Sequence, residues 1–441
     1  MSGIAHLFLS RGMKVSGSDL KESQITQDLK KMGAQVFIGH DASQVADDVD
    51  TVVYSSAIKE DNPEIQEAKR RGIVLLKRAQ ALAELMKDKT VITVTGSHGK
   101  TTTTSLASLL LLEAGFCPTA AIGGIVRNMD SNACLGKSAF FVAEADESDG
   151  SFLYYLPKYS IITNIDYEHL DHYGDFQNEV NTFREFINRT DSNGCVFGCG
   201  DDDSLRSILK DYKHRYLLFG LTEDSHIYPG DIRLNGLNSE FSCFYKNKFL
   251  DRFQLALGGE HNISNSLAVI ALGLELGINL DIIKETLKNF QGARRRIEIK
   301  FESPQYLLID DYAHHPTEIK ATLKTVKDIK SDRIVAVFQP HRYTRTKFLL
   351  NEFAASFNLA DYIIITEIYP ASEPPIEGIS GELLFHNIRE QLPKDKEVVF
   401  LPKDQIVEHI LKIIRPHDLI IILGAGDIVK VGDELVERLK G

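Results

Sequence analysis

The amino-acid sequence predicts an α/β protein with mostly parallel sheets covered by helices. Short apolar runs of strand length alternate with amphipathic helical runs along almost the whole chain, a pattern typical of helices packed on parallel sheets. The length of 441 residues suggests two to four domains, at roughly 100–200 residues per domain. A glycine-rich turn between an apolar strand and a helix, at residues 95–102, indicates that one domain binds phosphate groups.

Residues 1–87 are predicted to form a first, Rossmann-like domain. A helix is expected near Gly3–Ser10 with Gly12 as its stop, and Asn62-Pro63 begins another. The chain begins inside the first expected helix. The opening strand of such a series is therefore expected upstream of Met1, most simply because translation starts upstream; the alternative is a true truncation that leaves the first sheet one central strand short. The predicted strands are Met13–Gly17, Val36–Ile38, Thr51–Ser55 and Ile73–Leu76.

Residues 88–295 are predicted to form a central domain that resembles the ATPases with a phosphate loop. A β-rich stretch at 227–257 contains the turn signals Pro229-Gly230 and Asn235-Gly236. The other expected strands are Val91–Thr95, Phe140–Glu144, Ser160–Asn164 and Val196–Gly198, and the expected helices are Lys100–Ala114, Ile263–Leu276 and Leu280–Asn289.

Residues 296–441 are predicted to form a third domain, a second Rossmann-like unit. Helices separate its apolar strands, which is the pattern of a doubly wound sheet. The expected strands are Tyr306–Ile309, Ile334–Phe338, Tyr362–Thr366, Val398–Leu401 and Leu419–Leu423.

The composition excludes several classes of function. The net charge is −12, and the densest basic run is Arg294–Arg296. This argues against broad nucleic-acid binding, which needs a basic surface. No apolar run reaches the ~18–20 residues of a membrane span, so no membrane insertion is expected. The five cysteines lack C-x-x-C spacing, and we expect reduced thiols in a cytoplasmic protein.

The turn after Val91–Thr95 has the pattern Gly-x-x-Gly-Lys-Thr-Thr. Glycines let backbone N–H groups approach phosphates, and the helix start adds positive potential. The lysine adds a full charge, and the first threonine offers a hydroxyl to Mg²⁺. Val94 replaces the first glycine of the general pattern, and a glycine-rich turn without a ligand is the alternative. The expected ATP-binding residues are Gly96, Ser97, His98, Gly99, Lys100, Thr101 and Thr102.

Acidic residues and a histidine follow the next two predicted strands. Phe140–Glu144 ends in an acid, and in phosphate-loop enzymes an acid at a neighbouring strand end reaches Mg²⁺. Asp146, Glu147 and Asp149 continue the acidic run, for which a solvated acidic loop is the alternative. His169 follows the next strand and is expected to ligate a second Mg²⁺ or orient its water. Because Mg²⁺ prefers oxygen ligands, a structural loop histidine is the alternative there.

Several motifs, in one order, resemble the Mur ligase family, which adds amino acids to UDP-linked muramyl precursors. The resemblance covers nearly the whole chain. Residues 95–103 are similar to the family's phosphate loop, 144–149 to its acidic run, and 163–171 to its T-N-x-x-x-E-H-x-D motif. Gly259–Asn265 is similar to the G-x-H-N-x-x-N motif, in which His261 and Asn262 would meet the adenine of ATP.

The first and third domains extend this resemblance. Asp310–Glu318 and Phe338–Thr346 resemble motifs of the branch that adds L-alanine. Ser16–Asp19 and Ser55–Ile58 resemble its nucleotide-sugar domain, whose G-x-G-G-x-G loop for the UDP pyrophosphate would precede Met1. Sister ligases carry a carbamylated lysine, and the helix expected around 179–188 contains Arg184 but no lysine, as the alanine-adding branch allows.

The resemblance implies an ATP-dependent ligase that joins L-alanine to the carboxylate of UDP-N-acetylmuramate through an acyl phosphate. It implies Thr101, Glu144 and His169 as ligands of Mg²⁺, and Lys100 and His169 as catalytic residues. Arg342 and Arg345 would contact phosphate or carboxylate, and His314 would position the alanine or take its proton. Arg295 would bind ATP from a basic hinge. We expect a monomer or weak homodimer whose third domain closes on the site.

Bland alternatives remain for the residues of the third domain. Arg342 and Arg345 could form a solvated helix start, His314 and His315 a capped structural turn, and Arg295 part of an exposed linker. Three rival functions also remain: a recycling ligase that attaches a whole peptide to the same nucleotide sugar, a folylpolyglutamate-type ligase, and a nucleotide-binding regulator without catalysis. The motifs of the third domain favour the alanine-adding activity.

Overall fold

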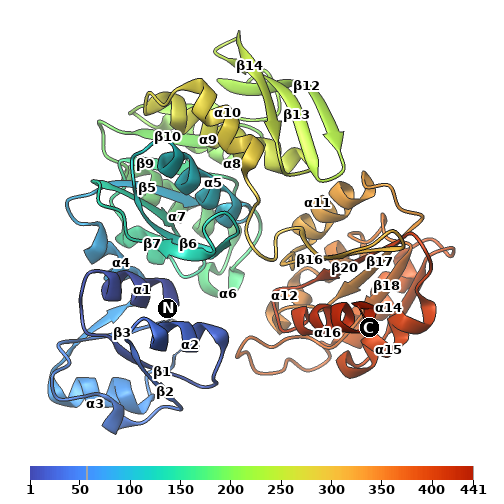
Figure 1. The fold of residues 1–441 in the computed structure, drawn as a ribbon, viewed down its shortest axis with the longest axis horizontal. Coiled ribbons are helices and arrows are strands. Elements are labelled where there is room, and N and C mark those ends of the chain that lie inside the picture. Colours follow the sequence, from blue (N-terminus) through green and yellow to red (C-terminus); the bar gives the residue numbers. More distant parts are fainter. Residues whose placement is uncertain (56–57, 441) are drawn as a thin grey trace. The chain divides into compact units, whose positions relative to one another are not determined.

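The computed structural model describes residues 1–55 and 58–440 and divides the chain into two compact units (Figure 1). Unit 1 comprises Met1–Tyr228, Tyr245–Asn247 and Asn265–Thr286. Unit 2 comprises Pro229–Phe244, Lys248–Ser264 and the chain from Leu287 onward. The Ser55–Ile58 motif falls partly outside the described residues, because Ser56 and Ala57 are not among them.

The N-terminal part of unit 1 contains two separate pairs of parallel strands, β1 with β2 and β3 with β4. No strand of the described residues joins the two pairs. The helix expected at Asn62-Pro63 is confirmed, since Asn62 caps it and Gly72 ends it with a positive φ. The predicted strand at 13–17 is shifted, because pairing begins where Ser16 lies opposite Gln35. The elements are α1 (Ser2–Ser10), β1 (Ser16–Asp19), α2 (Gln24–Lys31), β2 (Gln35–Ile38), β3 (Thr51–Tyr54), α3 (Pro63–Arg71), β4 (Val74–Lys77) and α4 (Arg78–Met86).

The main sheet of unit 1 has the strand order β11-β10-β9-β5-β8-β6-β7. All neighbours are parallel except β6 and β7, which form an antiparallel edge. Since β5 lies between β8 and β9, the carboxyl ends of these three strands meet at one edge, where open α/β sheets bind ligands. The strands are β5 (Thr90–Thr95), β6 (Thr119–Val126), β7 (Ser131–Cys134), β8 (Phe140–Glu144), β9 (Tyr159–Ile162), β10 (Cys195–Cys199) and β11 (Tyr216–Phe219).

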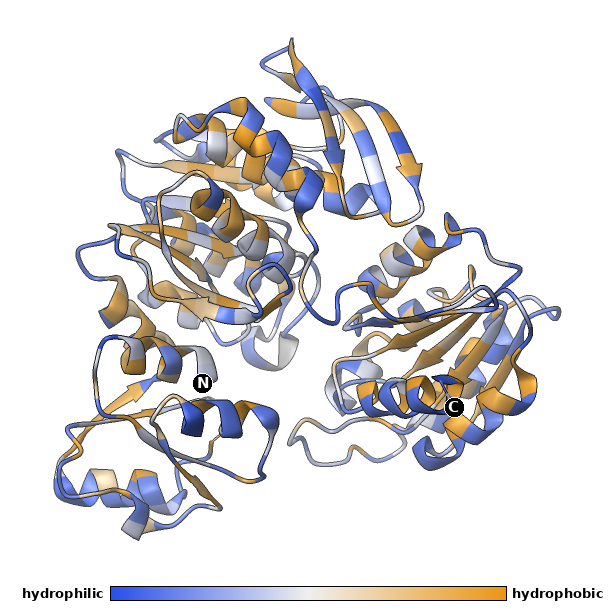
Figure 2. Ribbon diagram, in the orientation of Figure 1, coloured by the Kyte–Doolittle hydropathy of each residue, from blue (hydrophilic) through white to orange (hydrophobic). Residues whose placement is uncertain are grey.

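The helices of unit 1 bury apolar faces against this sheet. Helix α5 is buried along most of its length, which fits a helix between the sheet and other elements. The strands of the sheet are coloured as hydrophobic along most of their length in Figure 2. The helices that lie wholly or mostly in unit 1 are α5 (Lys100–Glu113), α6 (Leu170–Tyr173), α7 (Phe176–Asn188), α8 (Asp203–Asp211), α9 (Glu260–Glu275) and α10 (Leu280–Asn289).

The predicted β-rich stretch consists of β12 (Ile227–Asn235), β13 (Asn238–Tyr245) and β14 (Lys248–Leu255). The turn predicted at Asn235-Gly236 is confirmed, and Gly236 has a φ of 62°. The turn predicted at Pro229-Gly230 is wrong, because both residues lie inside β12. Gly230 serves close packing instead, since a Cβ there would lie 2.9 Å from the Phe244 ring.

The C-terminal part of unit 2 is a doubly wound sheet with the order β15-β16-β20-β17-β18-β19. Only β15 is antiparallel to its neighbour. One apolar cluster packs α11, α13 and α14 on one face, and a second packs α15 and α16 on the other. The strands are β15 (Glu298–Glu302), β16 (Tyr306–Asp311), β17 (Arg333–Phe338), β18 (Tyr362–Ile365), β19 (Glu397–Phe400) and β20 (Asp418–Leu423). The helices are α11 (Pro316–Lys327), α12 (Tyr343–Phe348), α13 (Leu350–Ala354), α14 (Gly381–Gln391), α15 (Ile406–Ile413) and α16 (Val429–Lys440).

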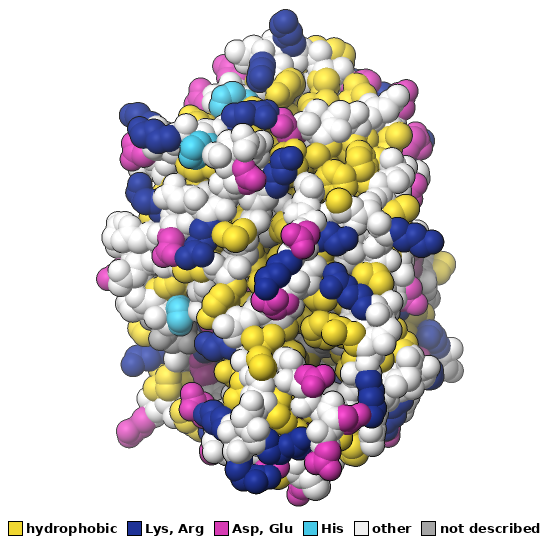
Figure 3. All heavy atoms as spheres, turned by 90° about the vertical axis from the view of Figure 1, so that its left-hand side faces the viewer, with side chains coloured by type: hydrophobic (Ala, Val, Ile, Leu, Met, Phe, Trp, Pro, Cys, Tyr) yellow, Lys and Arg dark blue, Asp and Glu magenta, His cyan; other side chains and the backbone are white. Residues whose placement is uncertain are grey.

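The surface agrees with the charge argument made from the sequence. On the face drawn in Figure 3, lysine and arginine side chains are interspersed with acidic ones and do not form one broad basic area. None of the helices in the described residues has both the length and the apolar character that a membrane-crossing helix requires.

Candidate active site

The phosphate loop of unit 1 has a backbone that requires its glycines. The loop follows β5 and leads into α5, and Gly96 and Gly99 have φ values of 126° and 83°. A Cβ on Gly96 would lie 2.2 Å from Thr163 Oγ1, and one on Gly99 would lie 2.6 Å from Asn265 Oδ1. Both conformation and space therefore exclude side chains at these positions. Lys100 is the first residue of α5, as the sequence predicts.

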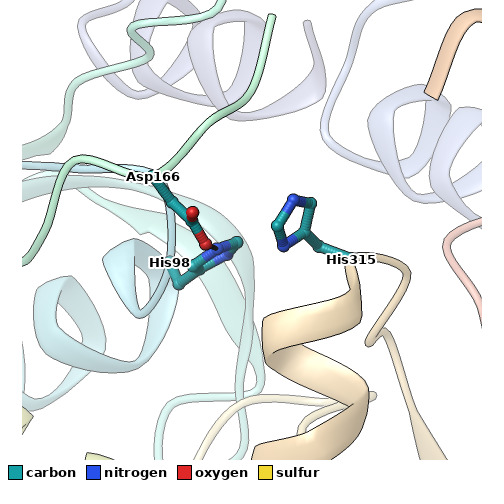
Figure 4. A group of neighbouring side chains, drawn as sticks. All are labelled: His98, Asp166 and His315. Carbon is teal, nitrogen blue, oxygen red and sulfur yellow. Dashed lines mark hydrogen bonds and ion pairs between the residues drawn. The ribbon is translucent and has the colours of Figure 1, made fainter. Parts of the chain in front are cut away.

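The segment after β9 fixes this loop by hydrogen bonds. Thr163 Oγ1 donates to the carbonyl of His98 over 2.6 Å, and the His98 N–H donates to Asn164 Oδ1 over 2.8 Å. The Asp166 N–H donates to Ser97 Oγ over 2.8 Å. His98 Nε2 also lies 2.8 Å from Asp166 Oδ2 (Figure 4). These hydrogen bonds fix the loop, which favours preorganised binding of a ligand.

The Lys100 amine lies among one carboxylate oxygen and two backbone carbonyl oxygens. Its Nζ donates to Glu147 Oε1 over 2.7 Å, and to the carbonyls of Gly96 over 2.6 Å and Ser97 over 3.1 Å. Burial lowers the pKa of Lys100, but the charges of Glu147 and Asp146 raise it by more, so the amine stays protonated. Glu147 is fully buried, so the interpretation of the acidic run as a solvated loop is wrong for this residue.

Thr101 and Glu144 meet as the sequence predicts. Thr101 Oγ1 donates to Glu144 Oε1 over 3.1 Å, and the Gly123 N–H of β6 donates to Glu144 Oε2 over 2.7 Å. A Cβ on Gly123 would lie 2.3 Å from Glu144 Oε1, so β6 approaches this carboxylate closely. Thr102 is buried in the first turn of α5. A hydroxyl and a carboxylate are oxygen ligands of the kind that Mg²⁺ prefers.

His169 lies among acidic groups and has a positive φ of 53°. Its Nε2 is 3.6 Å from Glu147 Oε1 and 3.6 Å from Glu168 Oε2. Glu179 of α7 is fully buried beside them. Burial raises the pKa of Glu179 to about 8, while the charge of His169 and the Glu168 N–H oppose this shift.

The donor set of this cluster fits a cation. In the part of the chain that the structure describes, Glu147 Oε2 and both carboxylate oxygens of Glu179 are buried without a hydrogen-bond partner. Such oxygens normally have partners, and a hard divalent cation would supply one. The sequence argument included Glu147 only in an acidic run and missed Glu179. The available signal for Glu179 was an acid on the apolar face of α7, beside Val180 and Phe183.

Unit 2 contains the adenine motif predicted from the sequence. The Asn262 side-chain amide donates to the carbonyl of Gly258 over 2.8 Å. His261 is partly exposed at the start of α9. Burial lowers its pKa to about 4, and the charge of Arg296 adds to this shift. The imidazole is therefore neutral at physiological pH and can act as a hydrogen-bonding or stacking surface.

Arg295 binds groups of its own unit. Its Nε donates to Asp310 Oδ2 over 3.0 Å, and its Nη2 donates to the carbonyl of Gly424 over 2.6 Å. Its guanidinium also lies over the ring of Tyr312, 5.2 Å from the centroid. The bland alternative of an exposed linker is therefore wrong for Arg295. A role toward ATP stays a prediction.

The two histidines after β16 have different surroundings. His315, also drawn in Figure 4, belongs to unit 2 and caps α11 by accepting a hydrogen bond from the Thr317 N–H over 3.3 Å. The capped-turn alternative is thus confirmed for His315. His314 Nδ1 lies 3.0 Å from the Tyr312 carbonyl and 3.2 Å from Glu318 Oε2. Its ring packs edge-on against His341, with 5.4 Å between centroids.

Arg342 and Arg345 are held at the carboxyl edge of the doubly wound sheet. Arg342 Nε donates to Glu373 Oε1 over 2.6 Å. Arg345 is 9% exposed, and its Nη1 donates to the His341 carbonyl over 3.2 Å. The alternative of a solvated helix start is therefore wrong. His341 entered the sequence analysis only as part of the Phe338–Thr346 motif, and neither His341 nor Glu373 was given a role there.

The structure therefore brings the predicted residues into two groups. In unit 1, Gly96–Thr102, Glu144 and His169 surround one strand–helix turn. In unit 2, the predicted residues after β16 and β17 share the carboxyl edge of one sheet, linked by the contact between His314 and His341. This is the edge at which doubly wound sheets bind ligands.

Comparisons with known proteins agree with this architecture. Three family models match: the Mur ligase family catalytic domain at residues 1–90, the Mur ligase middle domain at 94–273 and the Mur ligase glutamate ligase domain at 295–426. The fold defines an α/β protein with a phosphate loop and a C-terminal doubly wound sheet. More specifically, the chain belongs to the Mur ligase family.

Individual relatives cover the whole chain. The UDP-N-acetylmuramate–L-alanine ligases of Geotalea uraniireducens and of Geobacter sp. strain M21 are each 44% identical over 441 residues; the alignments span 100% of this chain and 96% and 95% of those proteins. The solved structure of UDP-N-acetylmuramate-alanine ligase from Thermotoga maritima matches with a TM-score of 0.85 and 29% identity, over 100% of this chain and 96% of that one. A murein peptide ligase from Psychrobacter arcticus shares the fold, with a TM-score of 0.74 at 24% identity over 100% of this chain and 96% of that one.

Proposed function

We propose that the chain joins L-alanine to the carboxylate of UDP-N-acetylmuramate at the expense of ATP, in the synthesis of peptidoglycan precursors. The observation that carries this proposal is the grouping of Lys100, Thr101 and Glu144 at the phosphate loop. The relatives that match the whole chain are named for the same activity. The products are the amide, ADP and inorganic phosphate.

The proposal assigns three domains. Residues 1–87 bind the UDP sugar, residues 88–295 bind ATP, and residues 296–441 contribute the amino-acid site and close on the reactants. His261, Asn262 and Arg295 bind the nucleotide. The enzyme works in the cytoplasm as a monomer or weak homodimer.

In the first step, the lactyl carboxylate oxygen attacks the γ-phosphorus of ATP, forming an acyl phosphate and releasing ADP. Both reactants are anions, so positive charge at the transferring group decides the rate. Lys100 supplies one such charge, and the helix start of α5 adds N–H groups. Thr101, Glu144 and His169 would hold Mg²⁺, which supplies further charge neutralisation when bound.

In the second step, the alanine amine attacks the acyl carbon, and the tetrahedral intermediate releases phosphate. The ammonium form of alanine must first lose a proton, and His314 takes it or holds the amine in place. Arg342 and Arg345 bind the phosphate or carboxylate groups of the reactants. Exclusion of water protects the acyl phosphate from hydrolysis.

A phosphate-release assay tests the proposal. Purified chain is mixed with ATP, Mg²⁺ and UDP-N-acetylmuramate, and each amino acid is added separately. We expect release that depends on L-alanine. Equal rates with D-glutamate, or without any amino acid, would contradict the proposal. A tripeptide in place of L-alanine separates this activity from the peptide-attaching one, and preference for the tripeptide would favour the latter.

A further inference from the structure

Helix α7 presents an acid where its sequence pattern calls for an apolar side chain. The buried residues of α7 are Glu179, Val180, Phe183, Phe186 and Ile187. Glu179 has no exposed surface. Neither of its carboxylate oxygens has a hydrogen bond of normal geometry among the described residues, and the Glu168 N–H only partly offsets the effect of burial on its pKa. A buried carboxylate without a partner is costly, so its presence indicates a group that the protein chain alone does not provide.

The surroundings of Glu179 indicate the charge of that group. Glu147, Glu168 and His169 are close enough to act electrostatically on Glu179. Lys100 contacts Oε1 of Glu147, but Glu147 Oε2 is buried without a partner. Three carboxyl groups therefore lie near one lysine and one histidine, so acidic groups outnumber basic ones in the cluster. Additional positive charge at this point would satisfy several buried oxygens together.

The chemistry of the donors narrows the choice to a small, hard divalent cation. Carboxylate oxygens are the ligands that both Mg²⁺ and Mn²⁺ prefer. Lys100 and His169 contact the cluster, and a bound cation would add positive charge at the remaining buried oxygens.

We propose that Glu179 is an acidic ligand of the divalent cation held at His169, acting together with the free oxygen of Glu147. This rests on the proposed function and deepens it, because it assigns the second cation site to residues from three segments: the acidic run, the loop after β9 and α7. Glu179 anchors the site from a rigid helix, whereas Glu147 and His169 lie on loops. Its removal weakens the binding of that cation and leaves the site at Thr101 and Glu144 in place.

Binding of Mn²⁺ to the full chain tests this proposal. Mn²⁺ is titrated in the presence of the non-hydrolysable ATP analogue adenylyl imidodiphosphate, and free Mn²⁺ is measured by electron paramagnetic resonance. We expect two Mn²⁺ ions per wild-type chain. Glu179→Gln should bind the weaker ion at least about tenfold less tightly, as loss of a supporting ligand does in other metal sites. The tighter ion should be retained.

Two further variants keep the result interpretable. Glu185→Gln changes an acid of the same helix that pairs with Arg189 and whose side chain is 55% exposed; it should bind Mn²⁺ as the wild type does. Glu179→Asp keeps the acidic group and should recover part of the affinity for Mn²⁺. This variant also tests the proposal if Glu179→Gln folds poorly. A wild-type chain that binds one Mn²⁺, or equal binding by wild type, Glu179→Gln and Glu179→Asp, would overturn the proposal. Failure of the proposed function would instead appear as absent L-alanine dependence in a chain that still binds two ions.

Discussion

The two units hold their charged groups in different ways. In unit 1, acids outnumber cations around the phosphate loop: Lys100 contacts Glu147, while Glu179 has no hydrogen-bond partner among the described residues. In unit 2, two of the predicted arginines contact acids, since Arg295 contacts Asp310 and Arg342 contacts Glu373. Unit 1 is therefore suited to receive added positive charge, whereas these two cations of unit 2 are already paired with acids.

This difference indicates how each site would work. An excess of buried acid in unit 1 favours a cation that arrives with the nucleotide. In unit 2, an arginine that binds an anionic reactant must share or exchange its acidic partner. The acid pairs in unit 2 position the guanidinium groups but neutralise part of their charge. The loop of unit 1 is positioned by hydrogen bonds to its backbone, and Lys100 contacts one carboxylate, that of Glu147.

The largest effect is expected from removing the cation of unit 1. Lys100→Ala should lower kcat by about 10²–10³-fold, because the transition state of phosphoryl transfer loses a preorganised positive charge. The measurement is L-alanine-dependent phosphate release at saturating ATP. Lys210→Ala, which changes an exposed lysine on α8, should retain the wild-type rate. A change of less than twofold in the Lys100 variant would remove the phosphate loop from the chemistry.

Unit 2 should show smaller and partly separable effects. Arg345→Ala should lower kcat/KM by about 10²-fold, because a buried guanidinium beside His341 is lost. Glu373→Gln should lower it by only about tenfold, since Arg342 keeps its charge and loses only the acid that positions it. Steady-state rates with varied L-alanine give both values.

Lys347→Ala provides the control in unit 2, because it removes an exposed cation from the same helix as Arg345. Its kcat/KM should equal that of the wild type. If Glu373→Gln lowered kcat/KM more than Arg345→Ala did, the acid itself would contact a reactant. The stated difference between the two units would then be wrong.

The sequence predicted the residues that follow strand ends most reliably. Gly96, Lys100, Glu144 and His169 each lie just after an apolar strand, and parallel strands bring their carboxyl ends to one edge. The local sequence pattern is sufficient for these residues, because the parallel sheet itself brings the strand ends together. Glu179 could not be placed in this way, since its distance from His169 depends on how α7 packs against the acidic loop.

Some strands and their pairing partners could not be predicted from the sequence pattern either. The strands β6, β7, β11 and β15 were not predicted. β7 and β15 lie at sheet edges, Gly123-Gly124 interrupts the apolar pattern of β6, and β11 has only four residues, so each gives a weak strand signal. The Pro229-Gly230 pair was predicted as a turn, and the structure shows that Gly230 accommodates the Phe244 ring instead. A glycine needed for space and one needed for a positive φ look alike in a single sequence.

The smallest expected effect concerns His261, whose pKa is lowered by burial to about 4 from an ordinary 6.5. Since the unfolded chain binds the proton first as the pH falls, the full contribution of His261 to stability is present above pH 6.5 and is lost between pH 6.5 and about 4. His261→Gln removes this titration. Between pH 7.5 and 5, the free energy of unfolding of the wild type should fall by about 1 kcal/mol more than that of the variant, allowing for partial exposure. The measurement is urea unfolding at both pH values. His386→Gln, which changes an exposed histidine on α14, should follow the wild type. An equal fall in the free energy of unfolding in all three proteins would show that folding does not lower the pKa of His261, and that unit 2 shields its charged groups less than the packing indicates.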